Sequence, residues 1–339
     1  MTIIATLSKA AERAPFPDAA TRAGISWLVG RTRRKLAELP VPDSDFAALM
    51  AKLPIAEHVD AANAQHYEVP AAFFALTLGP RRKYSCCLYE DGARSLAEAE
   101  VRALEASARR ADLRDGQRIL ELGCGWGSLS LFMAERYPAA RITAVSNSAS
   151  QRTYIQAQAA QRGLRNLEIV TADMNAFRAD GLFDRIVSIE MFEHMSNWRA
   201  LLTRIRSWLA PEGRVFIHVF AHRSRAYRFD LDDKDDWIAR HFFTGGVMPS
   251  HGLIRQFADI LTIEEEWRWS GVNYERTALD WLDNFDEGGE EMDRVLREVY
   301  GDDAKLWRRR WRLFFLATAG LFGDRGAEWG VSHYRLKAA

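Results

Sequence analysis

The chain has 339 residues, of which 48% are hydrophobic and 27% charged, and its 46 Lys and Arg balance its 46 Asp and Glu. This ordinary globular composition excludes disordered, collagenous and fibrous proteins, and a formal charge of zero gives no electrostatic reason to expect a nucleic-acid partner. Three cysteines, two of them adjacent at Cys86 and Cys87, do not suit a disulfide framework, so we expect a reducing, cytoplasmic location.

The N-terminal residues 1–65 are predicted to form a helical cover. Ile25, Leu28 and Val29 share one face of a helix, with basic residues beyond them. We favour an amphipathic cover helix over a membrane anchor. Near the other end, the apolar stretch at 313–323 is shorter than the ~20 residues of a transmembrane helix, so no membrane span is expected.

The segment at 66–95, HYEVPAAFFALTLGPRRKYSCCLYEDGARS, is aromatic and interrupted by Pro70, Gly79 and Pro80. Such a segment more often lines a site than fills a core. A helix follows it, because Ser95 and Glu98 have the spacing of a capping box.

From residue 117 onward, apolar strands alternate with helices. Strands are predicted at 117–123, 140–147, 167–173, 184–192 and 214–220, and helices at 127–137, 150–163 and 198–213. This alternation predicts an α/β fold with a parallel sheet covered on both faces. The alternation stops near 221, so a domain at 66–339 is expected to have its core at 115–220 and a helical substrate cap at about 221–330.

A glycine-rich loop, GCGWG, connects the first predicted strand to its helix. Gly123, Gly125 and Gly127 let the backbone pass close to a ligand, and ligands of such sheets lie at the carboxyl ends of the strands. A dinucleotide-binding loop would need glycine at 128, where Ser128 stands. The spacing therefore favours a cofactor without a pyrophosphate.

The loop resembles motif I of class I S-adenosylmethionine-dependent methyltransferases. Together with HYEVPAAFF, YSCCLY, VSIEMFEHM and FFTGGVMPS, it resembles the cyclopropane-fatty-acid-synthase-like group of these enzymes, most closely the coclaurine N-methyltransferase branch. The resemblance covers about 60–339. It implies a Rossmann-like, seven-stranded methyltransferase sheet with the cofactor over its first strands.

The same resemblance implies S-adenosylmethionine as the cofactor, and we expect no metal. The cofactor-binding residues that it implies are Tyr84, Ser85, Gly123, Gly125, Ser146, Asn147, Gln151, Asp173, Met174 and Glu190. For Asp173 alone, a helix N-cap is the alternative interpretation.

Three ionisable residues, Glu190, Glu193 and His194, follow the fourth predicted strand. An amine acceptor with a pKa near ~10 arrives protonated and has no lone pair to donate. A carboxylate can attract the ammonium and a neighbouring imidazole can take its proton. We expect Glu193 and His194 to deprotonate and orient the amine, while Glu190 holds the cofactor or the cation. The matching Glu-x-x-Glu-His has this role in coclaurine N-methyltransferases.

The resemblance also raises a rival chemistry. Cyclopropane synthases methylate a lipid alkene and then lose a proton to bound bicarbonate, and three bicarbonate residues have counterparts here in Cys86, Glu193 and His218. A tyrosine completes that site in the family, but the matching region RLFFLATAG has Phe314 and Phe315 and no tyrosine hydroxyl, and glycine usually stands where Glu190 is. Both departures favour a small hydrophobic amine acceptor over an acyl chain. A thiol or another heteroatom acceptor stays open.

The acceptor pocket is expected to include His218, Phe314, Phe315 and Trp329, the aromatic residues stacking on the substrate. For most of these aromatic residues, ordinary packing is the alternative interpretation. The basic run WRRRWR could instead make a weak contact with anionic lipid. A homodimer is compatible with the sequence, which does not determine the oligomeric state.

Overall fold

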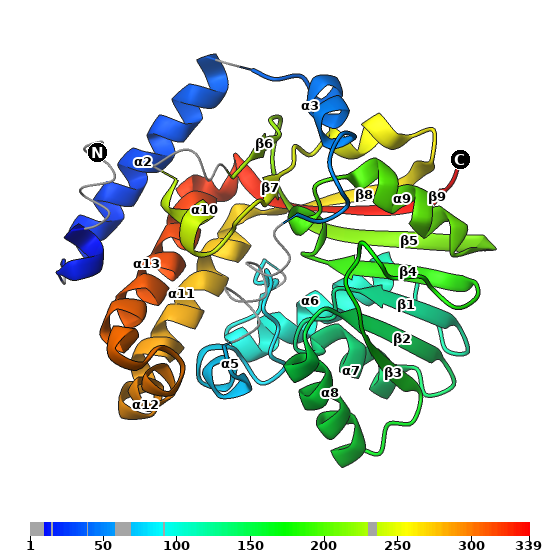
Figure 1. Ribbon diagram of the computed structural model, residues 1–339, viewed down its shortest axis with the longest axis horizontal. Coiled ribbons are helices and arrows are strands. Elements are labelled where there is room, and N and C mark those ends of the chain that lie inside the picture. Colours follow the sequence, from blue (N-terminus) through cyan, green and yellow to red (C-terminus); the bar gives the residue numbers. More distant parts are fainter. Residues whose placement is uncertain (1–9, 15, 39, 58–68, 91, 230–235) are drawn as a thin grey trace.

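The computed structural model describes residues 10–14, 16–38, 40–57, 69–90, 92–229 and 236–339. Its seven-stranded sheet has the strand order β3-β2-β1-β4-β5-β9-β8 (Figure 1). The first five strands in this order run parallel, and β9 alone runs in the opposite direction, pairing antiparallel with both β5 and β8. The strands are β1 (Arg118–Leu122), β2 (Arg141–Ser146), β3 (Leu167–Thr171), β4 (Phe183–Ile189), β5 (Leu209–His222), β8 (Leu261–Ser270) and β9 (Trp329–Ala338). The predicted α/β fold is confirmed.

Helices cover both faces of the sheet. The helices of this layer structure are α6 (Leu96–Arg110), α7 (Ser128–Arg136), α8 (Ala149–Gln161) and α9 (Trp198–Ser207). In β1, the neighbouring side chains Ile119 and Leu120 point to opposite faces, and both are fully buried. Ile119 packs in the cluster that contains α6 and α7, and Leu120 packs in the one that contains α9. Burial on both faces explains why these strands appear in the sequence as continuous runs of apolar residues.

The boundary between α9 and β5 differs from the prediction. The helix was expected to continue to residue 213, but it ends at Ser207 and β5 already begins at Leu209. Pro211 accounts for the difference, because proline has no amide hydrogen and disfavours helical backbone at the residue before it.

The range 221–330 does not form a purely helical cap. It contains α10 (Trp237–His241), α11 (Gly271–Glu287), α12 (Gly289–Tyr300) and α13 (Ala304–Phe322), but also β6 (Tyr227–Arg228), β7 (Val247–Met248) and the sheet strand β8. The sequence of β8 lacks the apolar–polar alternation of a strand, because three exposed residues, Glu264, Glu265 and Glu266, follow one another at this edge of the sheet. A register shift between Ile263 and Glu265 interrupts the alternation further. The predicted domain boundary at 65/66 and most of the acidic run before Trp237 lie outside the described residues.

The N-terminal helices are α2 (Asp18–Glu38) and α3 (Asp43–Met50), and α5 (Ala71–Thr77) follows them. In Figure 1, α2 lies beside α13 on the side of the molecule away from the sheet. Ion pairs hold it there, since Arg312 on α13 contacts Asp18, and Arg33 contacts Asp324 at 2.8 Å.

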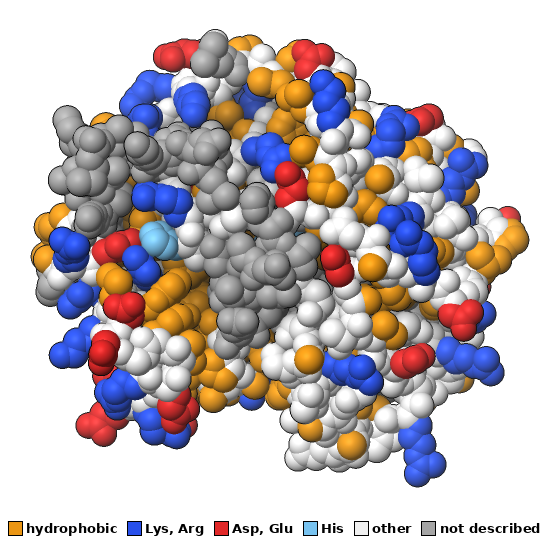
Figure 2. All heavy atoms as spheres, viewed as in Figure 1, with side chains coloured by type: hydrophobic (Ala, Val, Ile, Leu, Met, Phe, Trp, Pro, Cys, Tyr) orange, Lys and Arg blue, Asp and Glu red, His pale blue; other side chains and the backbone are white. Residues whose placement is uncertain are grey.

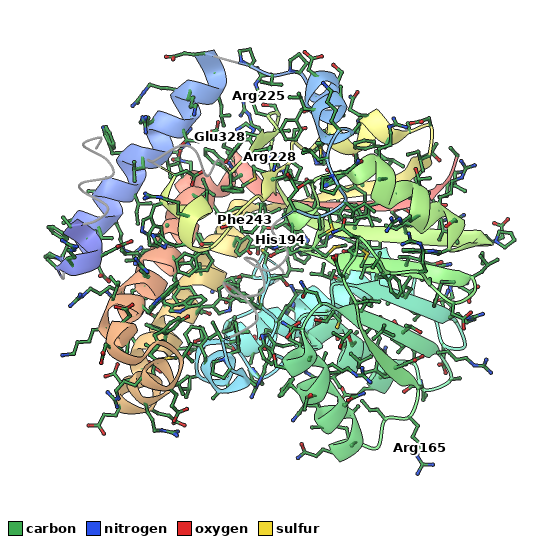
Figure 3. All side chains as sticks on the ribbon, in the orientation of Figure 1. Arg165, His194, Arg225, Arg228, Phe243 and Glu328 are labelled. Atoms are coloured by element: carbon green, nitrogen blue, oxygen red, sulfur yellow. The ribbon has the colours of Figure 1, made fainter. Side chains whose placement is uncertain are left out.

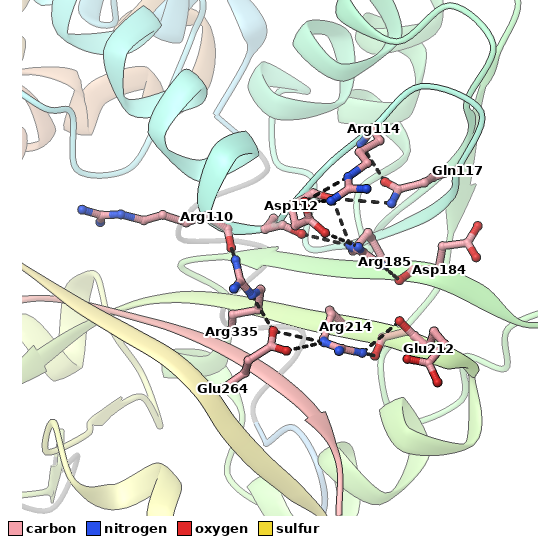
Figure 4. A network of polar contacts seen from close by, with 12 residues as sticks. Arg110, Asp112, Arg114, Gln117, Asp184, Arg185, Glu212, Arg214, Glu264 and Arg335 are labelled. Atoms are coloured by element: carbon pink, nitrogen blue, oxygen red, sulfur yellow. Dashed lines mark hydrogen bonds and ion pairs between the residues drawn. The ribbon is translucent and has the colours of Figure 1, made fainter.

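Charged networks tie the last strands to the rest of the sheet. Figure 4 shows Asp112, after α6, held by Arg185 of β4 at 2.5 Å, and Glu264 of β8 held by Arg335 of β9 and Arg214 of β5. On the face shown in Figure 2, basic and acidic side chains are interspersed, as the balanced composition predicts.

Candidate active site

A cavity of about 770 Å³ lies at the carboxyl ends of β1, β2, β3 and β4, with α2 and α13 on its other side. This volume lies within the range of small-molecule and cofactor sites. All ten predicted cofactor residues line it: Tyr84, Ser85, Gly123, Gly125, Ser146, Asn147, Gln151, Asp173, Met174 and Glu190. Eight of them come together because parallel strands present their carboxyl ends at one edge of the sheet, and the segment between α5 and α6 adds Tyr84 and Ser85.

The glycine-rich loop forms the tight turn from β1 into α7. Gly123, Gly125 and Gly127 have φ values of +81°, +51° and +77°, which favour glycine. A side chain on Gly123 or Gly127 would collide with Met191 or Ile155, whereas a Cβ on Gly125 would meet nothing within 4 Å. The loop therefore packs tightly at two glycines and leaves open space for a ligand at the third.

The ends of β2 and β3 present hydroxyl, amide and carboxylate groups to the cavity. Ser146 donates to Gln151 Oε1 at 2.6 Å, and Ser148 caps α8. Asp173 accepts from the backbone amide of Asn175 at 2.8 Å, so part of its carboxylate does stabilise the following turn, as the capping interpretation supposed. It lines the cavity at the same time.

The segment that contains Tyr84 and Ser85 forms another wall. The ring of Tyr84 packs between Phe74 and Trp281. Beside it, the ammonium group of the buried Lys83 donates to Ser85 Oγ and to the Cys86 carbonyl at 2.7 Å. Lys83 was not among the predicted site residues, although it directly precedes them. The three cysteines are buried and free.

Glu190 has a strained backbone and a fully bonded carboxylate. Its φ of +47° is rare for a residue with a side chain, and such conformations concentrate at functional sites. Oε1 accepts from the Cys86 amide at 3.0 Å and lies 3.1 Å from His218 Nε2, and Oε2 accepts from the Tyr274 hydroxyl at 2.7 Å. Burial raises the pKa of Glu190 above its usual value, although the charge of Lys83 and the hydrogen bonds from the Cys86 amide and the Tyr274 hydroxyl oppose this shift. Three donors suit the ionised carboxylate.

Glu193 and His194 are adjacent but lie in different surroundings. His194 lines the cavity, with its ring 4.5 Å from that of Phe243, and Figure 3 shows the two together near the centre of the molecule. Glu193 lies outside the cavity lining, fully buried, and accepts from the Phe220 amide at 2.7 Å. Burial, and then the charge of Glu190, raise the pKa of Glu193 well above its usual range and so favour its neutral form.

Only one of the four predicted acceptor residues lines the cavity. Phe314 does so, stacked on Phe242 with ring centroids 4.4 Å apart. Phe315 points into the aromatic core, and Trp329 is buried in β9, where it donates to the Tyr227 hydroxyl at 3.1 Å. Phe315 is one residue from Phe314, and on a helix that step rotates a side chain to another face. His218 lies behind Glu190.

The expectation that the site lacks a tyrosine hydroxyl is wrong. Tyr274, in the first turn of α11, lines the cavity and donates to Glu190. The tyrosine was expected in the region that forms α13. A contact between a residue of α11 and the end of β4 has no local pattern in the sequence that would predict it. The signal that was available is the apolar spacing of GVNYERTALDWL after the cap Ser270.

The N-terminal helix α2 closes the cavity on the side away from the glycine-rich loop. Ile25, Leu28 and Val29, the predicted apolar face of α2, line the cavity together with Phe314 and Leu321 of α13. Across the described part of the chain, none of the helices is long and apolar enough to cross a membrane. Within the same ranges, no three His, Cys, Asp or Glu side chains are grouped as a metal-ion site would need.

Comparisons with known proteins agree with this geometry. The family model for mycolic acid cyclopropane synthetase matches residues 56–328. The (S)-coclaurine N-methyltransferase of Thalictrum flavum subsp. glaucum is 35% identical over 294 residues, covering 85% of this chain and 81% of that protein. The cyclopropane-fatty-acyl-phospholipid synthase of Escherichia coli (strain K12) is 28% identical, covering 79% of this chain and 66% of that protein.

A crystal structure of coclaurine N-methyltransferase bound to N-methylheliamine and SAH superposes with a TM-score of 0.92 at 32% identity, covering 99% of this chain and 100% of that one. The open space at Gly125 and the polar groups at the ends of β2 and β3 suit the same cofactor. The chain therefore belongs to the mycolic acid cyclopropane synthetase family, as a class I S-adenosylmethionine-dependent methyltransferase near the coclaurine N-methyltransferase branch.

Proposed function

We propose that this enzyme methylates the nitrogen of a small hydrophobic amine. The observation that carries the proposal is a carboxylate and an imidazole, Glu190 and His194, on the cavity wall next to the glycine-rich loop. A buried negative charge on the wall of the same cavity as the apolar side chains of α2 and α13 favours a cationic acceptor. The relatives named for coclaurine N-methylation add support from outside the chain.

When bound, S-adenosylmethionine supplies a methyl group that its sulfonium charge has already activated. The chain must then align a lone pair with that methyl group and exclude water. In the proposal, Glu190 attracts the ammonium form of the acceptor, and His194 takes its proton from the cavity wall. Glu193, buried outside the cavity lining with a raised pKa, has a positioning role at most, through the Phe220 amide that it holds. Phe314 and the apolar face of α2 hold the hydrophobic part of the acceptor.

The arrangement around Glu190 argues against alkene chemistry. Counterparts of all the family's bicarbonate residues are now present, since Tyr274 joins Cys86, Glu193 and His218. Three of these, through the Cys86 amide, the His218 imidazole and the Tyr274 hydroxyl, already contact the oxygens of Glu190. The carboxylate of Glu190 thus occupies the bonds that a bicarbonate ion would need. A fixed carboxylate in that place favours binding of a cation.

The test is a labelled methyl-transfer assay with the full-length protein. Purified enzyme and S-adenosylmethionine carrying a 13C methyl group are incubated with a panel of cyclic secondary and tertiary amines, with aromatic thiols, and with vesicles of unsaturated phospholipid. We expect label on the nitrogen of hydrophobic amines, and loss of that activity in Glu190→Gly with binding of S-adenosylmethionine retained. Label in the lipid alone, or in thiols alone, would overturn the proposal.

The second candidate is a lipid-modifying enzyme that acts on unsaturated acyl chains. The complete set of bicarbonate counterparts is the observation that favours it. Contact of WRRRWR with anionic lipid would help such an enzyme, but three of its arginines are already paired with carboxylates: Arg308 with Asp293, Arg310 with Glu12, and Arg312 with Asp286 and Asp18. Their charge is therefore largely compensated within the protein.

A further inference from the structure

Three buried nitrogen-containing rings pack together behind Glu190. His218 of β5 and His333 of β9 stand directly opposite each other in the antiparallel ladder, with ring centroids 4.5 Å apart. Trp269 of the next strand, β8, lies 4.4 Å from the His333 ring and 5.3 Å from the His218 ring. All three side chains are at most 2% exposed. The mechanism proposed above assigns no role to His333 or Trp269.

Each of these rings has one nitrogen without a hydrogen-bond partner among the residues that the structure describes: His218 Nδ1, His333 Nε2 and Trp269 Nε1. The other imidazole nitrogens are engaged. His218 Nε2 contacts Glu190 at 3.1 Å, and His333 Nδ1 contacts the Arg110 guanidinium at 2.5 Å. A buried polar nitrogen without a partner destabilises the fold, so three in one cluster require an explanation.

The engaged nitrogens determine where the protons are. A guanidinium group can only donate, so His333 Nδ1 accepts and the ring proton is on Nε2. A carboxylate can only accept, so His218 Nε2 carries the proton and Nδ1 has a free lone pair. Burial, together with the charges of Lys83 and Arg110, holds the pKa of both histidines well below the usual range, so both rings are neutral. Two N–H donors, on His333 and Trp269, therefore accompany one acceptor, on His218.

We propose that a single buried water molecule binds between His218, His333 and Trp269. Such a water accepts from His333 and Trp269 and donates to His218, which is the usual number of about three bonds for a buried water. The site completes a chain of donors that runs from the Arg110 cation through His333, the water and His218 to the Glu190 anion. Each bond in such a chain polarises the next. His333 is thus a positioning residue, because it acts on Glu190 only through the water and His218.

This chain of hydrogen bonds has a consequence for catalysis, which rests on the proposed role of Glu190. The other groups that face this carboxylate are Tyr274, the Cys86 amide and, by charge, Lys83, with Glu193 as a further carboxyl nearby. A donor chain that ends on Oε1 favours the ionised form and so lowers the pH at which Glu190 becomes protonated. Removing the hydrogen-bonding nitrogens of His333 should therefore move the acidic limb of the pH–rate profile to higher pH.

Two measurements test the water site. High-resolution crystal structures of the wild type and of His333→Phe are expected to show one water in the wild type, within hydrogen-bond distance of all three nitrogens, and its loss in the variant. The proposal is overturned if the wild-type density holds no water there. This readout does not depend on the acceptor, so wild-type enzyme that contains the water but methylates no amine would contradict the proposed function alone.

The second measurement is the pH dependence of kcat/KM. We expect the acidic limb of His333→Phe to move up by about one pH unit, a tenfold loss below the limb, while His333→Gln, whose amide can both accept and donate, stays closer to the wild type. His251→Phe is the matched control, since this histidine contacts Ser332 of β9 but has no connection to Glu190. If His333→Phe is poorly folded, Trp269→Phe removes one donor instead. A folded His333→Phe enzyme with a wild-type profile refutes the role in positioning.

Discussion

Replacing Tyr274 with phenylalanine isolates one hydrogen bond at the centre of the site. The hydroxyl donates to Glu190 Oε2 at 2.7 Å, and the ring stacks on Phe322 with centroids 4.4 Å apart. Phenylalanine keeps the stacking and removes only the donor. A hydrogen bond to a charged group contributes about 1.5–3 kcal/mol, so the pKa of Glu190 should rise by about 1–2 units. If that stabilisation of the anion is used in binding the ammonium, kcat/KM for the amine falls by roughly 10- to 100-fold.

The assay is methyl transfer to the best amine of the panel between pH 6 and 9, with the affinity for S-adenosylmethionine measured in parallel by calorimetry. The loss in Tyr274→Phe should be largest at low pH, where the raised pKa leaves Glu190 protonated. Tyr334→Phe is the matched control, because this equally buried hydroxyl donates to the His251 carbonyl at 2.7 Å, away from the cavity. Wild-type kcat/KM for Tyr274→Phe at every pH, or an equal loss in Tyr334→Phe, would refute the reasoning.

Three further predictions concern the cofactor loop, the acceptor wall and a buried carboxyl. Gly125→Ala and its control Gly163→Ala each put a Cβ at positive φ with open space around it, so both variants should have a slightly lower Tm. Calorimetry should show that S-adenosylmethionine binds about tenfold more weakly only to Gly125→Ala, because only there does the methyl group enter the cavity. Phe314→Ala should raise KM for the amine with Tm little changed, whereas Phe315→Ala, in the core, should cost about 3–5 kcal/mol of stability in denaturant unfolding; the opposite pattern would contradict the assignment. Burial raises the pKa of Glu121 to about 7, so the folded state holds a proton that the unfolded state has lost above pH 4.5. The free energy of unfolding therefore falls as pH rises from 4.5 to 7. Urea titrations at pH 5 and pH 8 should show that Glu121→Gln lacks this part of the pH dependence, which is on the order of 3 kcal/mol.

The residues that the sequence could place share a short-range signal. The glycines at 123 and 125 follow an apolar strand, and Ser146, Asp173 and Glu190 each stand at or just after the end of another strand. The resemblance to the methyltransferase family identified Ser146 and Asp173, and these residues share one cavity because parallel strands end at one edge of the sheet. The carboxylate and imidazole pattern at 190–194 was visible for the same reason.

Local sequence says much less about the far side of the cavity. Phe314 and Phe315 are equally aromatic neighbours, and only the packing of α13 against α2 and α11 decides which one lines the cavity. Tyr274 reaches Glu190 across 84 residues of chain, a contact that no periodicity records. Glu193 and His194 are likewise adjacent, but one is buried and the other lines the cavity.

The sequence by itself determined the α/β fold and the strand ends that form one side of the cavity, because these follow from strand periodicity and from glycine at strained turns. The tertiary structure alone decided the strand β8 at the sheet edge, the acceptor wall, and the donors that converge on Glu190 and His218. Those features depend on contacts between segments far apart in the chain, where burial and hydrogen-bond geometry, and not residue type, set the role of each side chain.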